Sequence, residues 1–420
     1  MRILWFTNTP SCYNSSKTPY NGGGWISSAE KMIKRQPDIQ LGISFILKDD
    51  KFKIIRDNVT YYPVNINKSL YKRLTERMSK NIEYSKKNWP LYVEQFKKVI
   101  DDFQPDIIQV FGSENYFGLI GSHTSIPVVL HIQGILNPYL NAFLPPHMSW
   151  NIYNKSISRN NFKEKIKLLL FGSDKNLWEK ACLREREIYK RIHYYLGRTT
   201  WDKRVTKIMN TKAKYYECGE ILREEFYTEC KRSIPSKLTI VTTISNSPYK
   251  GFDLLLKTAY LLKYNLQLDF EWKVYGNINA SYVEKQYNIY SDNVNVKLMG
   301  VANAKDLRAA ELSATLYVHT SYIDNSPNSL CEAQILGLTC IATNVGGIPS
   351  LINDGKSGFI VPANDPYQLA YLINKLYLDI DLNYTIGNEA RSCAMRRHNP
   401  SCIISNLLKI YKLIIDENKQ

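Results

Sequence analysis

The sequence predicts an α/β protein with two doubly wound, Rossmann-like parallel sheets, one in each of two domains. Short apolar segments alternate with helical patterns in the first half of the chain, and the alternation restarts after Pro235. The 420 residues are long for one domain and sufficient for two, each with its own core. We therefore expect two globular domains.

The first half predicts an N-terminal domain over residues 1–232. Strands are expected at Ile3–Thr7, Ile43–Leu47, Val59–Pro63, Ile107–Phe111 and Val128–Ile132, with helices after the glycines at 22–24 and around Tyr92–Phe103. A helical, charged stretch from about Asn161 to Tyr195 then interrupts the alternation. We interpret residues from about 155 to 200 as a helical insertion in this domain.

The second half predicts a C-terminal domain over residues 233–398. Strands are expected at Leu238–Ile244, Phe270–Tyr275, Val294–Met299, Leu316–Thr320, Cys340–Thr343 and Phe359–Val361. A last helix over 399–420 carries an apolar stripe that needs a partner: Ile403, Ile404, Leu407, Leu408, Tyr411, Ile414 and Ile415. Ligands of such folds bind at the carboxyl ends of the strands, so we expect a site in a cleft that both sets of strands face.

The composition is that of an ordinary globular protein, with 44% hydrophobic and 22% charged residues. The N-terminus lacks the apolar stretch and cleavage site of a signal peptide, and no apolar run approaches the ~18 residues of a membrane span. The eight cysteines show neither a Cys-x-x-Cys pair nor metal-finger spacing. Reduced thiols in the cytoplasm are the simplest interpretation.

The positive charge is concentrated in the first half. Residues 1–236 hold 38 Lys and Arg against 23 Asp and Glu, whereas the rest of the chain holds 17 and 16. Dense runs occur at Lys68–Lys98 and Arg159–Lys214. A basic, Tyr-rich face suits nucleic acid, anionic lipid or an anionic glycan, although a solvated surface is the better interpretation of any single cluster. No helix-turn-helix, RNA-recognition signature or zinc finger favours nucleic acid.

The junction between the strand ending at Thr320 and the next helix carries two acidic residues, Asp324 and Glu332. Ser326 followed by Pro327 predicts a helix start, with the serine hydroxyl as cap. The opening amides, on Asn328, Ser329 and Leu330, suit a phosphate because they carry the positive end of the helix dipole. Glu332 is then placed to reach sugar or ribose hydroxyls. For this segment alone, an ordinary surface helix with a capped start is an equally good interpretation.

The stretch from Ser321 to Pro349 resembles the donor-binding signature of family 4 of the retaining GT-B glycosyltransferases. The resemblance rests on Asp324, Glu332, Gly337, Ile341 and the run Gly346–Pro349. In that family the first acidic residue, usually Glu, lies at the transferred sugar, and the second binds the ribose of the nucleotide. Asp324 is one methylene shorter than the usual Glu. The resemblance also implies that the C-terminal helix crosses back onto the first domain.

Lys250 and Gly251 follow the first strand of the second domain. A lysine there would neutralise a leaving diphosphate, and the resemblance implies that role, although most lysines at helix starts are merely solvated. The family places an arginine about five residues earlier, where this chain has Ser245. Arg198 is one candidate to compensate for it. We also assign Gly276 and Val301 to donor binding.

The glycine run Gly22–Gly24 follows the first strand. Glycines let a backbone approach a ligand closely, and the resemblance assigns this loop to the donor phosphates and acceptor, with Gly23 and Gly24 on the donor side and Trp25 on the acceptor side. A flexible turn is the alternative interpretation. The run is neither a dinucleotide fingerprint nor a Walker loop, which argues against a dehydrogenase or an NTPase.

Gln133 ends the strand Val128–Ile132, where many family members have a histidine at the sugar site. Glutamine donates and accepts hydrogen bonds but carries no proton at neutral pH, so it orients the sugar rather than acting as a base. We expect His131, on the same face, to be packed beneath. Glu114 also follows a strand end and is assigned to the acceptor.

No histidines or acidic residues have metal-ligand spacing; the single Asp-x-Asp, Asp379 to Asp381, is interpreted as solvated surface at a helix end. The sequence thus predicts a cytoplasmic, metal-independent and cofactor-free transferase, and the resemblance implies that it retains the configuration of the sugar. It would move a hexose-type sugar from a UDP or GDP donor to a glycan acceptor. We expect its partners to be a lipid-linked glycan and the inner membrane surface. A catalytically degenerate sugar-nucleotide or polysaccharide-binding subunit, suggested by Ser245 and Gln133, and a nucleic-acid-binding protein, suggested by charge alone, are the alternatives.

Overall fold

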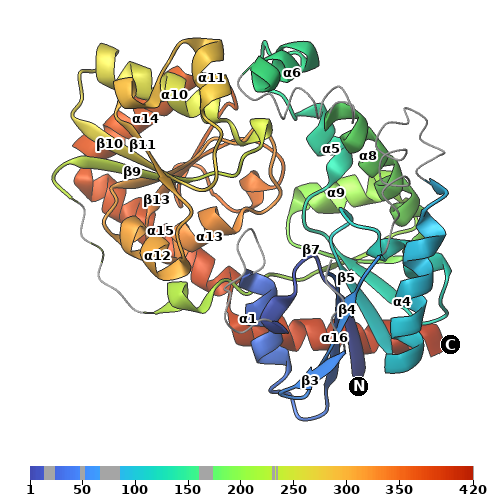
Figure 1. Ribbon diagram of the computed structural model, residues 1–420. Coiled ribbons are helices and arrows are strands. Elements are labelled where there is room, and N and C mark those ends of the chain that lie inside the picture. Colours follow the sequence, from blue (N-terminus) through green and yellow to red (C-terminus); the bar gives the residue numbers. More distant parts are fainter. Residues whose placement is uncertain are drawn as a thin grey trace. The chain divides into compact units, whose positions relative to one another are not determined.

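The computed structural model confirms the predicted fold class (Figure 1). It describes residues 1–13, 24–47, 53–66, 86–159, 174–228, 232 and 235–419. The chain divides into two compact units, the first built from 1–140, 166–221 and 399–420 and the second from 141–165 and 222–398. Each unit contains one sheet with helices on both faces.

The first unit contains an eight-stranded sheet with the strand order β3-β4-β2-β1-β5-β6-β7-β8. All neighbouring strands run parallel except β3 and β4, which form an antiparallel edge. The strands are β1 (Arg2–Phe6), β2 (Gln40–Ile46), β3 (Ile54–Arg56), β4 (Val59–Val64), β5 (Ile107–Phe111), β6 (Val128–His131), β7 (Tyr194–Gly197) and β8 (Lys214–Glu217).

Strands β7 and β8 correct the sequence-based prediction, which had no strand between Ile132 and Leu238. Each is only four residues long, and β8 combines two tyrosines with two charged residues, so neither shows an aliphatic run. Both add to the sheet in parallel, β7 beside β6 and β8 beside β7. Helix α8 (Asp174–Arg191) lies within the stretch that we interpret from the sequence as a helical insertion.

Alternate residues of β1 enter two different cores, as the two-residue period of a strand requires. Ile3 and Trp5 pack on one face with α1 (Gly24–Ile33) and α16 (Pro400–Lys419). Leu4 and Phe6 pack on the other with α4 (Trp89–Phe103), η2 (Phe117–Ser122) and α8. The other helical segments of this unit among the described residues are η1 (Ser11–Tyr13), α5 (Leu136–Asn141) and α9 (Thr200–Met209).

The C-terminal helix α16 belongs to the first unit, as the resemblance implied. Its apolar stripe is buried against β1 and α1. A polar chain runs through the same contact: the Trp5 Nε1 donates to the Tyr411 hydroxyl at 3.1 Å, and that hydroxyl donates to the Gln109 side-chain oxygen. Gln109 in turn lies 3.3 Å from His131 Nδ1. The helix is therefore held by directed bonds as well as by apolar packing.

Replacing Tyr411 by phenylalanine is expected to lower the free energy of unfolding by about 1–3 kcal/mol. The ring would still fill the core, but the buried Trp5 indole and the Gln109 oxygen would each lose their partner, and an unpaired buried polar group costs roughly that much. Chemical denaturation of the variant would measure the effect. Tyr194→Phe is a control, because Tyr194 accepts a bond from Asn418 on the same helix with only partial burial; an equal loss in both variants would contradict the role of the buried chain.

The second unit contains a six-stranded parallel sheet with the order β11-β10-β9-β12-β13-β14. The strands are β9 (Leu238–Thr243), β10 (Phe270–Tyr275), β11 (Val296–Gly300), β12 (Leu316–His319), β13 (Thr339–Thr343) and β14 (Phe359–Val361). The α-helices that cover it are α10 (Phe252–Tyr260), α11 (Ser281–Tyr287), α12 (Ala304–Leu312), α13 (Asn328–Ile335), α14 (Pro366–Leu378) and α15 (Ile380–Arg397). Shorter turns are η3 (Glu224–Tyr227), η4 (Pro248–Lys250), η5 (Leu261–Asn265), η6 (Ser291–Val294) and η7 (Ile348–Ser350).

The segment after α5 packs on the second unit through aromatic rings. Phe143 lies 5.8 Å from the ring of Tyr249, and Tyr153, in α6 (Trp150–Arg159), lies 5.8 Å from that of Tyr282. The Tyr287 hydroxyl also donates to the Pro146 carbonyl at 3.4 Å. These contacts explain why residues 141–165 group with the second unit. Within the described ranges, no helix has both the length and the apolar character that crossing a bilayer requires.

Candidate functional site

The residues assigned to donor binding in the second unit follow the carboxyl ends of neighbouring strands. Lys250 follows β9, Gly276 follows β10, Val301 follows β11 and Asp324 follows β12. All of these strands run parallel, so their carboxyl ends meet at one edge of the sheet. This edge gathers residues that are distant in the sequence.

An ion pair that the sequence did not predict lies at this edge. Lys250 Nζ is 2.6 Å from Asp324 Oδ2, with the side chains only 18% and 10% exposed. His319 Nε2, at the end of β12, lies 3.2 Å from the same oxygen, and the Ser321 hydroxyl donates to it at 3.4 Å. The Asp324 carboxylate is therefore the centre of a compact polar cluster.

Burial opposes ionisation of Asp324, but the Lys250 ammonium and His319 outweigh it, so the pKa of Asp324 lies well below its usual range. Burial also opposes the charge on Lys250, and the attraction of Asp324 outweighs it and raises the pKa of the ammonium. Burial lowers the pKa of His319. At neutral pH the cluster thus consists of an ammonium, a carboxylate and a neutral imidazole.

Two glycines of the family motifs are required by close backbone contacts on either side of this cluster. Gly251 has a φ of +72°, and a Cβ there would collide with the Thr320 carbonyl oxygen. The Thr320 hydroxyl donates to the Lys250 carbonyl at 3.0 Å, which joins the two loops. Gly346 has a φ of +52°, and a Cβ there would collide with the Asp324 carbonyl oxygen. Only glycine fits both places, so these motifs fix the positions of Lys250 and Asp324.

Helix α13 begins at Asn328, and the predicted serine cap is wrong. The residue before the helix is Pro327, which has no side chain to bond the first amides. Ser326 Oγ lies 4.0 Å from Cys331 Sγ instead. The first turn is supported from the sheet, because the Tyr317 hydroxyl on β12 donates to Ser329 Oγ at 2.8 Å. The helix nevertheless begins directly after the Asp324 loop, as expected.

Glu332 lies on the buried side of α13 and is 2% exposed. Both of its oxygens accept from the Arg223 guanidinium, Oε1 from Nε and Oε2 from Nη2, each at 2.7 Å. Burial raises the pKa of Glu332, and Arg223 acts against that rise. A second carboxyl, Glu311 on α12, is fully buried and neither oxygen has a hydrogen-bond partner. Burial and the charge of Glu332 raise the pKa of Glu311 well above its usual range.

In the first unit, Gln133 and Glu114 follow β6 and β5, as expected. Gln133 Nε2 lies 3.5 Å from the His131 carbonyl oxygen. Glu114 Oε1 accepts from the Gly134 amide at 2.9 Å, and burial raises the pKa of Glu114 to about 7. The expectation that His131 is packed beneath is confirmed: it is buried, and burial lowers its pKa to about 3.

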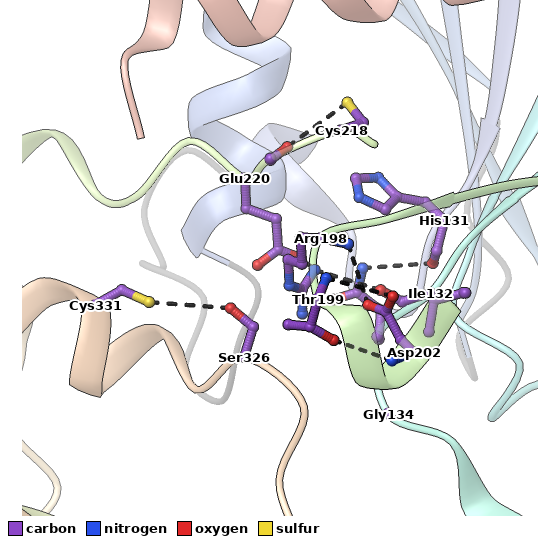
Figure 2. A network of polar contacts seen from close by, with 12 residues as sticks. His131, Ile132, Gly134, Arg198, Thr199, Asp202, Cys218, Glu220, Ser326 and Cys331 are labelled. Atoms are coloured by element: carbon purple, nitrogen blue, oxygen red, sulfur yellow. Dashed lines mark hydrogen bonds and ion pairs between the residues drawn. The ribbon is translucent and has the colours of Figure 1, made fainter. Parts of the chain in front are cut away.

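Arg198, the candidate compensating cation, is paired within the first unit. Figure 2 shows its guanidinium against the Glu220 carboxylate and the Ile132 carbonyl. Trp25 is buried in the core, 5.3 Å from the ring of Phe111. Gly24 opens α1, whereas Gly23 lies outside the described residues. The ligand-binding roles of these residues stay predictions.

Sequence reasoning missed His319, Arg223 and Glu311. Histidine at a strand end and an acidic residue on an amphipathic helix carry no local signal of their neighbours. Arg223 lies 109 residues from Glu332 in the sequence, so only the tertiary structure brings them together. Among the residues that the structure describes, no three His, Cys, Asp or Glu side chains form a group suited to hold a metal ion.

Comparisons with known proteins support this fold. Residues 231–392 match the family model of glycosyl transferases group 1. The capsular polysaccharide biosynthesis glycosyltransferase CapM of Staphylococcus aureus is 25% identical over 65% of this chain and 62% of its own length. A D-inositol 3-phosphate glycosyltransferase of Corynebacterium jeikeium is 35% identical over 24% of this chain and 22% of its own length. The chain thus matches less than two thirds of each of these two relatives.

Solved structures match over nearly the whole chain. Sucrose-phosphate synthase from Thermosynechococcus elongatus has a TM-score of 0.71 at 13% identity, covering 99% of both chains. HepE of Anabaena, in complex with UDP-glucose, has a TM-score of 0.66 at 15% identity, covering 98% of this chain and 99% of that one. TarM has a TM-score of 0.65 at 14% identity, covering 98% of both.

The two parallel sheets, the C-terminal helix on the first unit and these structural matches define a protein of GT-B fold. Its C-terminal part, residues 231–392, matches the family model of glycosyl transferases group 1. The resemblance predicted from the sequence, to a GT-B glycosyltransferase of the bacterial surface-polysaccharide type, is confirmed.

Proposed function

We propose that this protein transfers a hexose-type sugar from a nucleoside diphosphate donor, UDP- or GDP-linked, to a glycan acceptor in surface-polysaccharide synthesis. The observation that carries the proposal is the cluster of Lys250, Asp324 and His319 beside the start of α13, within the matched residues. A buried ammonium next to the positive end of a helix suits a diphosphate. The similarity to CapM, a capsular polysaccharide biosynthesis glycosyltransferase, and to HepE, whose structure contains UDP-glucose, supports this class of reaction.

The proposed mechanism is electrostatic. An ammonium has three donors, so Lys250 keeps two for donor phosphate oxygens while Asp324 holds the third. The amides of Asn328, Ser329 and Leu330 add the positive end of the α13 dipole to the departing diphosphate. Glu332 binds the ribose hydroxyls, and Asp324 and Gln133 orient the transferred sugar. We include retention of the sugar's configuration in the proposal because the family resemblance implies it.

The test is transfer itself, measured with UDP- and GDP-sugars and a lipid-linked glycan fraction. We expect one nucleotide to raise the melting temperature, since a ligand that binds only the folded state stabilises it.

We also expect transfer to continue in EDTA, because protein groups rather than Mg²⁺ meet the charge of the leaving group. Loss of transfer in EDTA that Mg²⁺ or Mn²⁺ restores would overturn the metal-independent mechanism.

The second candidate function is a catalytically degenerate sugar-nucleotide or polysaccharide-binding subunit. It is favoured by Ser245 and Gln133, which stand where the family usually has an arginine and a histidine. Such a subunit would bind nucleotide yet neither hydrolyse the donor nor transfer to any acceptor extract. Transfer to the lipid-linked fraction would exclude it.

The basic first half is proposed to dock on the inner face of a membrane, where a lipid-linked acceptor resides. The test changes Lys72, Arg73, Lys86 and Lys87 to glutamine. Lys72 and Arg73 lie outside the described residues, and Lys86 and Lys87 precede α4. Each basic residue near an anionic surface contributes roughly 1 kcal/mol, so four changes to glutamine should abolish most binding to anionic liposomes. Co-sedimentation with liposomes at about 0.1 M and 1 M salt measures this binding. It should weaken at the higher salt concentration, because the screening length falls from about 10 Å to about 3 Å. Equal binding to neutral liposomes, or no effect of the four changes, would contradict it.

A further inference from the structure

A segment from the first half of the chain carries a group of aromatic rings onto the second unit. Residues 141–156, called the aromatic segment from here on, begin where α5 ends and are grouped with that unit. Phe143 and Trp150 stack with their ring centroids 5.0 Å apart, and Tyr153 meets Trp150 edge-on at 5.8 Å. Phe143 and Tyr153 are 4% and 6% exposed. The aromatic segment therefore buries its rings on a unit whose sheet begins only at Leu238.

The aromatic segment reaches the second unit at two places. The ring of Tyr153 lies 5.8 Å from that of Tyr282 on α11, in an edge-to-face arrangement. The ring of Phe143 lies 5.8 Å from that of Tyr249. The second contact bears on the functional site, because Tyr249 directly precedes Lys250.

Tyr249 joins the aromatic segment to the cluster around Asp324. Its ring centroid lies 5.5 Å from Lys250 Nζ, within the range at which an aromatic face attracts an ammonium. Its carbonyl accepts from the Tyr322 amide at 2.6 Å, which ties the loop after β9 to the loop that carries Asp324. A displacement of Tyr249 would therefore be felt by both charged members of the cluster.

The ammonium of Lys250 needs such neighbours to keep one orientation. A lysine side chain has a flexible four-carbon stem and loses conformational freedom wherever it is held. Asp324 accepts one of its three donors at 2.6 Å, and the Tyr249 ring lies on another side of it. Phe143 is a ring against which Tyr249 packs. The position of the ammonium is thus linked, through one intervening ring, to the aromatic segment.

We propose that Phe143 and Tyr249 are positioning residues for Lys250: the aromatic segment holds the Tyr249 ring, and that ring directs the ammonium toward the donor diphosphate. The inference rests on the proposed function, because it takes the diphosphate as the ligand of Lys250. The match to the family model covers residues 231–392, and the aromatic segment lies outside it. A part of the chain that precedes the whole second sheet would then contribute to the donor site of that unit.

The experiment is a double-variant cycle of Phe143→Ala and Lys250→Ala, measured as sugar transfer at saturating donor. Phe143→Ala alone should lower the turnover number at least about tenfold and change the KM for the donor less, because a misplaced charge is missed mainly in the transition state. In the Lys250→Ala background the same change should alter turnover by less than about twofold, since no ammonium is left to position. Phe143→Leu should recover most of the turnover, because leucine keeps apolar bulk against Tyr249.

A purely structural role for Phe143 predicts a different pattern. Phe270→Ala is the matched control, because Phe270 is a buried phenylalanine of the same unit at the amino end of β10, opposite the carboxyl edge of the sheet. It should lower the melting temperature and leave turnover within about twofold of the wild type. Phe143→Ala may not follow that pattern: unchanged turnover, or a loss by the same factor with and without Lys250, would overturn the inference.

The same pair of changes is also combined in an unfolding cycle, which needs no substrate. We expect the effects of Phe143→Ala and Lys250→Ala to depart from additivity by at least about threefold in the unfolding constant, because both residues contact Tyr249. Additive effects would overturn the inference whatever the transfer result. A wild type that transfers no sugar would overturn the proposed function, and the unfolding cycle alone would then decide the inference. Tyr249→Leu replaces Phe143→Ala in both cycles if the alanine variant fails to fold.

Discussion

Replacing Lys250 by alanine is expected to lower the rate of sugar transfer about 100- to 1000-fold. That is the usual cost of removing one preorganised group that stabilises charge developing in a transition state. The family arginine is replaced by Ser245, so no second cation of the usual pair backs up the lysine. The loss should fall mainly on the turnover number, because the charge on the leaving diphosphate grows as the bond breaks.

The same change is expected to destabilise the fold by about 3 kcal/mol, because it leaves the buried Asp324 carboxylate without its cation. The pKa of Asp324 is depressed in the folded state, so the stability that this group contributes is complete above the unfolded value of about 4 and is lost as the pH falls through the folded value. The difference in the free energy of unfolding between wild type and variant should therefore be measured near pH 7, and it should shrink in acid.

Two further variants separate the catalytic loss from the stability loss. Lys250→Met with Asp324→Asn removes both charges and should recover stability without recovering transfer. Lys257→Ala is the matched control, because Lys257 Nζ lies 2.9 Å from the buried Asp253 carboxylate in the same unit but does not belong to the cluster. It should lose stability and keep its turnover. Unimpaired turnover in Lys250→Ala would remove the lysine from the mechanism.

Glu332→Gln is expected to lower transfer at subsaturating donor about 10- to 100-fold, because it weakens donor binding by that factor. The amide keeps the shape of the side chain but loses charge-assisted bonds worth about 1.5–3 kcal/mol each. It also presents an NH₂ group to the Arg223 fork, which has only donors. The defect should appear as a raised KM for the donor, with turnover at saturation much less affected.

Calorimetry with the nucleoside diphosphate checks this expectation directly. Glu311→Gln serves as the control, since it changes another buried carboxyl of the same unit whose oxygens have no hydrogen-bond partner. The control should bind nucleotide almost as the wild type does. Unchanged nucleotide affinity in Glu332→Gln would refute the ribose assignment.

The sequence by itself determined the elements whose pattern is local. The strands Ile107–Phe111, Phe270–Tyr275 and Phe359–Val361 have the predicted limits. Ile107–Phe111 and Phe359–Val361 are mainly apolar runs, and Phe270–Tyr275 alternates apolar and charged residues; both patterns are local signals of a strand. The stripe of α16 likewise predicted a buried helix, and the stripe is buried. Strands β7 and β8 escaped prediction because β7 has only one aliphatic residue, Leu196, and β8 has none, so neither shows an aliphatic run.

The tertiary structure alone decided which side chains meet. Lys250 and Asp324 are 74 residues apart, and they pair because β9 and β12 are neighbours in the sheet and their following loops are joined at Thr320. Arg223 reaches Glu332 from a segment that precedes the whole second sheet. Hydrophobic periodicity is a property of adjacent residues, whereas a buried ion pair depends on strand order and on the loops that cover it. The motifs could therefore be recognised in the chain, but the charges that surround them could not.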